Sequence, residues 1–369
     1  MIYRAIGLMS GSSLDGLDIV FAEFHENGGK WTYEITAADC YEYKPEWSNR
    51  LKEAGTLSAL DYLLLHADYG HYLGEQVNRF IDDKGIHYQV ALIASHGHTV
   101  FHLPGKRMTA QLGDGAAIAA ETKLPVVSDL RSLDVAFGGQ GAPIVPIGEK
   151  LLLNEYDFFL NLGGIANISC NLASATNPEY VAFDVCPANR VLNMLANDAG
   201  KEFDDEGRIA ASGKSDTDLL EKLNVLEYYQ LKYPKSLAND FGTDVIYPML
   251  KNTGMPTNHL LRTYTEHIVV QVKNAIAGLK NKRQAAAFKL LCTGGGAFNT
   301  FLVNRLREQL KELNIDVVIP EEKLVKYKEA LIMALIGVLR WREKTNVLSS
   351  VTGAERDSVG GAMWMGQEE

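Results

Sequence analysis

The stretch Val181-Ala182-Phe183-Asp184-Val185-Cys186-Pro187-Ala188-Asn189-Arg190 places an acidic residue between an apolar run and a helical pattern. Residues 180–183 predict a short buried strand, and Pro187 is acceptable in the first turn of a helix that continues through residues 191–195. Asp184 is therefore predicted at a strand-to-helix junction, where open α/β sheets bind their ligands. It is a candidate general base or metal ligand, and the alternative is a side chain that only caps the helix.

The size and composition of the chain indicate a soluble globular protein with two domains. It has 369 residues, and a prior of ~150 residues per domain predicts two cores. Hydrophobic residues make up 46% and charged residues 22% of it, and no run approaches the ~18 consecutive apolar residues of a membrane span. The first residues lack the basic and apolar regions of an export signal, so we expect a cytoplasmic protein that does not use a membrane.

Charge and cysteine content narrow the class of ligand. A formal net charge of -10 argues against a nucleic-acid partner, because phosphate backbones are bound by clustered Lys and Arg. The four cysteines are widely spaced and form no C-x-x-C pair, which indicates reduced thiols. If the ligand is a polyphosphate, backbone amides and a cation must hold it.

The order of the predicted elements occurs twice along the chain. Strands are predicted at residues 3–8, 19–24 and 31–36, followed by helices, and again at residues 157–162, 165–172 and 180–183, followed by the helix after Pro187. A glycine-rich turn follows the first strand of each copy. This repetition of topology predicts a duplicated domain around a cleft.

The glycine-rich segment 137–143 interrupts the pattern and predicts a hinge between the two lobes. We expect the first lobe to comprise residues 1–135 and about 345–369, with a closing helix that reaches Gln367 and packs on that lobe. The second lobe is expected over residues 136–344.

Three glycine-rich turns, at residues 11–16, 163–164 and 294–296, each follow an apolar strand. Glycine lets backbone amides approach a phosphate without a Cβ in the way. Three such turns together with Asp15, Asp18 and Asp184 in one chain predict a nucleotide cleft. Because carboxylates repel phosphates unless a cation lies between them, we also expect Mg²⁺, with Asp15 and Asp18 as its candidate ligands.

Several polar residues are candidates for the wall of this cleft. His96, His98 and His102 alternate, which favours one polar side of an extended segment, with a zinc site as the alternative. Arg131 and Asp134 precede the glycine hinge and are predicted to bind a polar substrate or, alternatively, to form a loop ion pair. The helix predicted over residues 327–342 has Glu329 near its start, so that residue either binds substrate or is favoured there by the helix dipole alone.

Ordered motifs along almost the whole chain resemble those of the anhydro-N-acetylmuramic acid kinases, which share a fold with sugar kinases, Hsp70 and actin. The matching segments are Gly7-Leu8-Met9-Ser10-Gly11-Ser12-Ser13-Leu14-Asp15-Gly16-Leu17-Asp18, Ser95-His96-Gly97-His98-Thr99-Val100, Gln111-Leu112-Gly113-Asp114, Gly138-Gly139-Gln140-Gly141-Ala142-Pro143, Asn161-Leu162-Gly163-Gly164-Ile165-Ala166-Asn167-Ile168, Gly294-Gly295-Gly296-Ala297-Phe298-Asn299 and Val351-Thr352-Gly353-Ala354.

The resemblance implies a fold and an activity. The fold is α/β, with two actin-like (ribonuclease H-like) lobes, each with a mixed five-stranded sheet flanked by helices, around an interdomain nucleotide cleft. The activity is opening of the 1,6-anhydro ring of 1,6-anhydro-N-acetylmuramic acid with water and phosphorylation of O6 by ATP with Mg²⁺, in cell-wall sugar recycling. A homodimer is compatible with it. Asp184 aligns with the catalytic Asp of the family. The implied ATP-binding residues are Gly11, Ser12, Ser13, Leu14, Asp15, Gly16, Leu17, Asp18, Gly163, Gly164, Gly294, Gly295, Gly296 and Asn299, and the substrate-binding residues are His96, Arg131, Asp134 and Glu329.

The sequence departs from the family at three places. The family usually has Thr where Ser12 stands and Gln where His98 stands, and its usual Asp-Thr-Gly-Pro-Gly-Asn is replaced here by residues 184–189 reading Asp-Val-Cys-Pro-Ala-Asn. Two alternatives stay open on the residues alone. One is a kinase of the same fold that acts on another sugar or sugar acid, and the other is a nucleotide-binding protein without catalytic activity.

Overall fold

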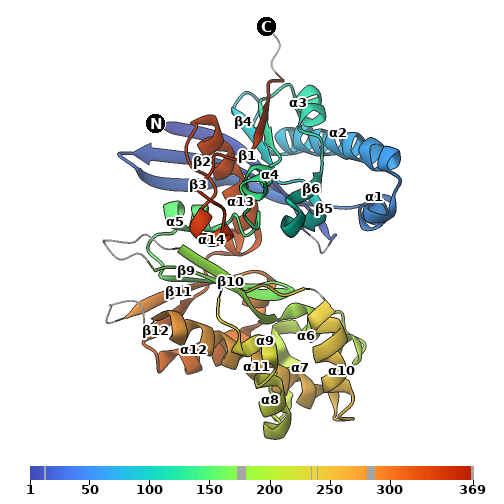
Figure 1. The fold of residues 1–369 in the computed structure, drawn as a ribbon, viewed down its shortest axis with the longest axis vertical. Helices are drawn as coiled ribbons and strands as arrows, with labels where there is room; N and C mark the ends of the chain where they lie inside the picture. The colour runs from blue at the N-terminus through green and yellow to red at the C-terminus, as the bar shows by residue number, and fades with distance from the viewer. Residues whose placement is uncertain (12–13, 173–179, 234, 239, 281–286, 367–369) are drawn as a thin grey trace. The chain divides into compact units, whose positions relative to one another are not determined.

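The computed structural model describes residues 1–11, 14–172, 180–233, 235–238, 240–280 and 287–366. It divides the chain into two compact units: unit 1 comprises Met1–Leu153 and Tyr327–Glu369, and unit 2 comprises Asn154–Lys326. Each unit is α/β and contains a mixed sheet flanked by helices (Figure 1). None of the described helices is long and apolar enough to cross a membrane.

Unit 1 is built on a six-stranded sheet in the order β13-β7-β4-β1-β2-β3. Strands β1, β2 and β3 form an antiparallel meander, and β4 and β7 are added in parallel to β1. The strands are β1 (Ile2–Ser10), β2 (Gly16–Asn27), β3 (Lys30–Glu42), β4 (Leu92–Ser95), β7 (Val126–Ser128) and β13 (Ala362–Trp364), and a separate hairpin consists of β5 (His98–Leu103) and β6 (Met108–Leu112). The helices are α1 (Pro45–Glu53), α2 (Ala59–Lys84), α3 (Gly115–Thr122), α4 (Ser132–Ala136), α5 (Pro146–Leu152), α13 (Glu322–Trp341) and α14 (Ser349–Thr352).

Unit 2 repeats this topology in a five-stranded sheet, β10-β9-β8-β11-β12. An antiparallel meander, β8-β9-β10, is again extended in parallel on the side of its first strand, which confirms the predicted duplication. The strands are β8 (Phe158–Leu162), β9 (Ile165–Asn171), β10 (Tyr180–Pro187), β11 (Phe288–Thr293) and β12 (Ile315–Val318). The helices are α6 (Asn189–Asn197), α7 (Arg208–Ser212), α8 (Thr217–Asn224), α9 (Glu227–Gln230), α10 (Tyr247–Lys251), α11 (Thr257–Lys280) and α12 (Thr300–Lys311).

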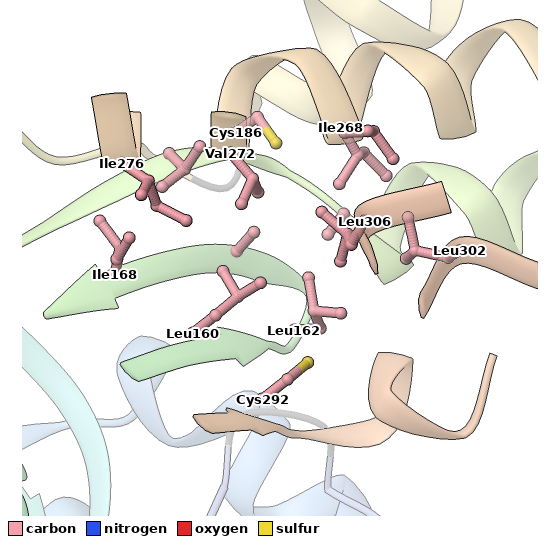
Figure 2. Close-up of a cluster of buried hydrophobic side chains, with 14 of the residues drawn as sticks. Leu160, Leu162, Ile168, Cys186, Ile268, Val272, Ile276, Cys292, Leu302 and Leu306 are labelled. Carbon is pink, nitrogen blue, oxygen red and sulfur yellow. The ribbon is translucent and has the colours of Figure 1, made fainter. Parts of the chain in front are cut away.

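One long helix in each unit packs on the sheet and contributes to its core. The long helix α2 begins at Ser58, whose hydroxyl caps it by accepting from Asp61 N–H, and it buries Tyr69, Leu73 and Phe80 against the first sheet. In unit 2, α11 is buried along most of its length and packs on the second sheet through residues that include Ile268, Val272 and Ile276 (Figure 2). Burial of this apolar area is the main source of stability of each unit.

Three expectations from the sequence are corrected. The predicted closing helix does not form in the described residues: Ala362–Trp364, which follows Gly361 with φ of 108°, is a strand that pairs with β7. Gln367, the predicted end of that helix, lies outside the described residues. The first sheet therefore has six strands rather than five. The unit boundaries also differ from 135/136 and 344/345: the hinge segment 137–143 lies within unit 1, and α13 belongs to that unit from Tyr327 onward because β1 packs directly on it.

Candidate active site

The first predicted glycine turn is the connection of the β1–β2 hairpin. Its ends are fixed by the pairing of Ser10 with Leu17 and by a hydrogen bond from Gly16 N–H to Asp15 Oδ1 at 3.0 Å. Leu14 has a left-handed backbone with φ of 58°. A Cβ on Gly16 would lie 2.6 Å from the Cys40 sulfur, so the close approach of β3 requires glycine there. Ser12 and Ser13 lie outside the described residues.

Asp18 follows this turn on β2, opposite Cys40 on β3. Burial raises the pKa of the Asp18 carboxyl to about 6, a hydrogen bond from Cys40 lowers it, and the charges of Asp15 and Glu329 raise it further. Burial and two neighbouring negative charges thus disfavour ionisation of Asp18, as expected of a place that accepts a cation or a proton. Among the described residues, no three His, Cys, Asp or Glu side chains form a ready-made metal site.

The buried His96 pairs with the partly buried Arg131 at the end of the first sheet. Arg131 Nε donates to His96 Nε2 at 2.9 Å, and the other ring nitrogen, Nδ1, lies 2.8 Å from the Gly97 carbonyl. Because an arginine only donates, the proton of the neutral ring is on Nδ1. Burial, with the Arg131 charge, lowers the pKa of His96 to about 3, so this ring stays neutral and orients the guanidinium.

Burial lowers the pKa of Arg131 to about 10, and the charge of Glu329 opposes that shift; the same charge adds to the effect of burial in raising the pKa of Asp18. The expectation that Glu329 opens a helix is wrong, because α13 begins at Glu322 and Glu329 lies in its interior. The helix-dipole alternative therefore does not apply. Gly7 on β1 has no room for a Cβ against the backbone of Ala330, and this close packing holds the Glu329 segment against the sheet.

Asp134 is 1% exposed and is engaged within unit 1. Its Oδ2 accepts from Gly141 N–H at 2.7 Å, and its Oδ1 accepts from the Thr352 hydroxyl at 2.7 Å. The carboxylate thus ties the glycine-rich segment 137–143 to α14. These two hydrogen bonds account for an acidic residue at this position without a bound ligand. The predicted ion pair between Arg131 and Asp134 is not formed, because Arg131 bonds to His96.

In unit 2, Asp184 lies within β10, at an irregularity of its pairing with β9 between Asp184 and Cys186. The strand continues to Pro187, so the prediction that Pro187 starts the helix is wrong; β10 is an edge strand, where proline is tolerated. The helix α6 is capped at Ala188 without a side-chain bond, so Asp184 is not its cap.

The carboxylate of Asp184 is oriented by a segment that is distant in sequence. Leu237 N–H donates to Asp184 Oδ2 at 2.8 Å, and the Asp184 backbone is held by the Tyr228 hydroxyl at 2.7 Å and by the Lys235 carbonyl at 3.2 Å. Burial raises the pKa of Asp184, and the Leu237 amide lowers it. Among the described residues Oδ1 has no donor, so it can accept a proton. Sequence reasoning missed Leu237 because its contribution is a backbone amide.

The three residues by which residues 184–189 depart from the usual family pattern point into the core. Val185, Cys186 and Ala188 are 3%, 0% and 0% exposed and belong to the core of unit 2. Figure 2 shows the Cys186 side chain near Val272, among the residues of that core. These three side chains are therefore packed in the interior of unit 2.

The second glycine turn is not demanded by packing. A Cβ on Gly163 would meet protein atoms no closer than 3.4 Å, and one on Gly164 none closer than 3.9 Å. The Gly164 carbonyl accepts from Ala188 N–H at 2.8 Å, which ties the turn to the start of α6. Since neither position needs glycine for the fold, open backbone at this turn favours the approach of a ligand.

In the third glycine turn, packing requires glycine at two positions and leaves the third open. Gly294, with φ of 82°, and Gly296 would bring a Cβ to 2.5 Å of Asn161 Oδ1 and 2.7 Å of Leu162 Cβ respectively, so packing requires both. A Cβ on Gly295 would meet only Asn189, at 3.5 Å. The Asn299 side chain caps α12 by accepting from Leu302 N–H at 2.9 Å. Of the four predicted nucleotide contacts in this turn, Gly295 is the one that packing leaves open.

Two residues that sequence reasoning missed extend the polar site of unit 1. Ser10 Oγ lies 3.0 Å from His98 Nδ1, and the hydroxyl of Tyr43 donates to Ser10 Oγ at 2.8 Å. His98 is 6% exposed, and burial lowers its pKa. The alternating histidines drew attention to His98 in the sequence, but they gave no indication of its contact with Ser10 or of the bond from Tyr43.

Comparison with known proteins gives a consistent result. The family model described as "Anhydro-N-acetylmuramic acid kinase" matches residues 3–366. Similar curated proteins with that name come from Shewanella amazonensis (32% identical, 97% of each chain covered), Idiomarina loihiensis (31%, 98% of this chain and 99% of the relative) and Methylobacterium nodulans (32%, 97% and 98%).

Proposed function

Because this chain belongs to the anhydro-N-acetylmuramic acid kinase family and is a sugar kinase, we propose that it opens the 1,6-anhydro ring of anhydro-N-acetylmuramic acid and phosphorylates O6 with ATP. The observation that carries the proposal within this chain is the environment of Asp184. Its carboxylate is half-buried, one oxygen accepts from the Leu237 amide, and the other has no donor among the described residues.

Asp184 acts as the general base on the attacking water. The water oxygen bonds to the anomeric carbon as one of its protons passes to Asp184, and the bond between that carbon and O6 breaks. The freed O6 attacks the γ-phosphorus of ATP, the bridging P–O bond breaks, and ADP leaves. The products are N-acetylmuramic acid 6-phosphate, ADP and one proton. A base of this kind contributes about 10²- to 10⁴-fold to the rate.

Arg131 and Glu329 are the proposed contacts to the sugar. The Arg131–His96 hydrogen bond supports this role, because it orients the guanidinium without neutralising it. Glu329, an acceptor, lies near enough to Arg131 to affect its pKa. Together they offer a donor and an acceptor for a polar substrate. Asp134 we assign to holding residues 137–143 and α14.

The residues present fit ATP and Mg²⁺. The open glycines 163, 164 and 295 support binding of phosphates through backbone amides. Bound Mg²⁺ would neutralise charge on the β- and γ-phosphates, and it usually takes only one or two protein carboxylates. Asp15 and Asp18 are the proposed carboxylates; burial and, to a smaller extent, the charge of Asp15 raise the pKa of Asp18, and a bound cation would stabilise its ionised form.

ADP release measured with a panel of sugars tests the proposed function. We expect anhydro-N-acetylmuramic acid to support ATP consumption with Mg²⁺, and we expect N-acetylmuramic acid, N-acetylglucosamine and glucose to support little. Preference for another sugar would identify a kinase of different specificity, and tight ATP binding without turnover of any sugar would identify a non-catalytic protein. Since the reaction consumes ATP, we propose that the protein acts in the cytoplasm. We also propose a homodimer, which light scattering in solution would test.

A further inference from the structure

Arg190, in the first turn of α6, lies directly beside the second glycine turn. Its backbone N–H donates to the Gly164 carbonyl at 3.3 Å. A Cβ placed on Gly164 would lie 3.9 Å from both Cβ and Nε of Arg190, so the side chain borders the open backbone of the turn. This guanidinium and the turn are both parts of unit 2.

The Arg190 side chain has no partner among the described residues. Its Nε is buried and makes no hydrogen bond within that part of the chain. Three other arginines of unit 2 are paired with carboxylates: Arg305 and Arg262 with Glu266 at 2.8 and 3.0 Å, and Arg208 with Glu206 at 2.6 Å. Since buried donors are nearly always satisfied and a guanidinium is always charged, the unpaired buried Nε favours an anionic ligand at this position.

A second unsatisfied group lies at the same end of the sheet. Thr293, paired in register with Asn161, is 1% exposed, and its hydroxyl has no hydrogen bond among the described residues. It precedes the third glycine turn as Asn161 precedes the second. An unsatisfied hydroxyl and an unsatisfied guanidinium nitrogen thus flank the two turns whose Gly163, Gly164 and Gly295 are open.

We propose that Arg190 contacts the phosphates of ATP at the Gly163-Gly164 turn. This inference rests on the proposed function and adds to it a residue that the glycine motifs do not include. The anion could be a phosphate of ATP or the lactyl carboxylate of the sugar. The open glycine turn favours the phosphate, because glycine amides and an arginine fork are the partners that phosphates prefer.

Equilibrium binding of ATP and of adenosine to the full-length chain tests the proposal. For Arg190→Gln we expect ATP affinity to fall about tenfold or more, since a charge-assisted bond to phosphate is lost, while adenosine affinity is unchanged. Arg190→Lys keeps the charge but not the fork, so it should lose less. Arg208→Gln, which removes an exposed arginine of the same unit, is the matched control and should bind ATP as the wild type does.

Several results would overturn the assignment. Equal losses for ATP and adenosine would indicate a general effect on folding of the site, and unchanged ATP affinity in both Arg190 variants would exclude the contact. A raised KM for the sugar with unchanged ATP binding would assign Arg190 to the lactyl carboxylate instead. If the wild-type chain itself does not bind ATP, the proposed function is refuted along with the role of Arg190. If the wild-type chain binds ATP and the Arg190 variants bind it equally well, the role of Arg190 alone is refuted.

Discussion

The backbone N–H of Leu237 donates to Oδ2 of Asp184 at 2.8 Å, across 53 positions of sequence. This bond fixes one carboxylate oxygen and orients the other. It also stabilises the ionised form, against the effect of burial, which raises the pKa of Asp184. A base must be ionised and oriented at once, and this pair of residues meets both conditions.

Asp184→Asn should lower kcat/KM by about 10²-fold or more while the fold is retained, because the amide keeps the size of the side chain but cannot take a proton. Steady-state ADP release with the sugar checks this. Asp316→Asn, on the exposed side of strand β12 in the same unit, is the control and should leave the rate unchanged. A rate for Asp184→Asn within about tenfold of the wild type would refute the general-base role.

The pH profile of kcat/KM should follow the ionisation of Asp184. Its pKa in the folded protein is raised by burial, so protonation removes the base as the pH falls through a value above the ~3.9 of an ordinary Asp. We expect an acidic limb with an apparent pKa above that value. The residual activity of Asp184→Asn should lack this limb. An identical limb in that variant would show that another group controls the profile.

Cys186→Gly should lower stability and leave the chemistry intact. The Cys186 side chain is fully buried in the core of unit 2, so its removal leaves a small cavity and adds backbone freedom. We expect a loss of about 2 kcal/mol in the free energy of unfolding, measured in urea. The KM for the sugar should not change. A changed KM with unchanged stability would mean that Cys186 contributes to the site rather than to the core.

Lys328→Met should be strongly destabilising. Lys328 Nζ lies 3.0 Å from Glu149 Oε1, with side chains 5% and 3% exposed, and the substitution removes the positive charge from this buried ion pair. We expect a loss of about 3–5 kcal/mol, with partial recovery when Glu149→Leu is added. Lys326→Met removes an exposed ion pair with Glu322 on the same helix and should cost under about 1 kcal/mol. Equal effects of the two lysine substitutions would contradict the account.

The sequence predicted the duplicated topology because apolar periodicity and glycine turns are local signals. The two meanders and their parallel additions match between the sheets. The predictions failed where contacts between distant segments determine the secondary structure. Pro187 extends β10 because that strand is an edge, and residues 362–364 form a strand because β7 offers a partner. The predicted helix began at residue 327, but α13 begins at Glu322, so Glu329 lies in its interior.

Only part of the candidate site could be predicted, because some of its features are local in sequence and others depend on contacts between distant segments. Asp18 and Asp184 lie within β2 and β10, and the glycine turns follow β1, β8 and β11, so local sequence patterns were enough to select them. The Arg131–His96 bond, the Leu237 amide and the unpaired Arg190 depend on which segments meet in three dimensions, and no spacing encodes them. The sequence around Asp134 suggested that it binds substrate. In the structure its two carboxylate oxygens accept hydrogen bonds from Gly141 N–H and the Thr352 hydroxyl.

Mass spectrometry of anhydro-N-acetylmuramic acid incubated with ATP, Mg²⁺ and the protein tests the central claim most directly. We predict a product heavier than the substrate by one water and one phosphoryl group, with one ADP formed for each product molecule and little product with Asp184→Asn. A product that gains the phosphoryl group without water, or equal product from the variant, would contradict the claim that Asp184 activates water for ring opening coupled to phosphorylation.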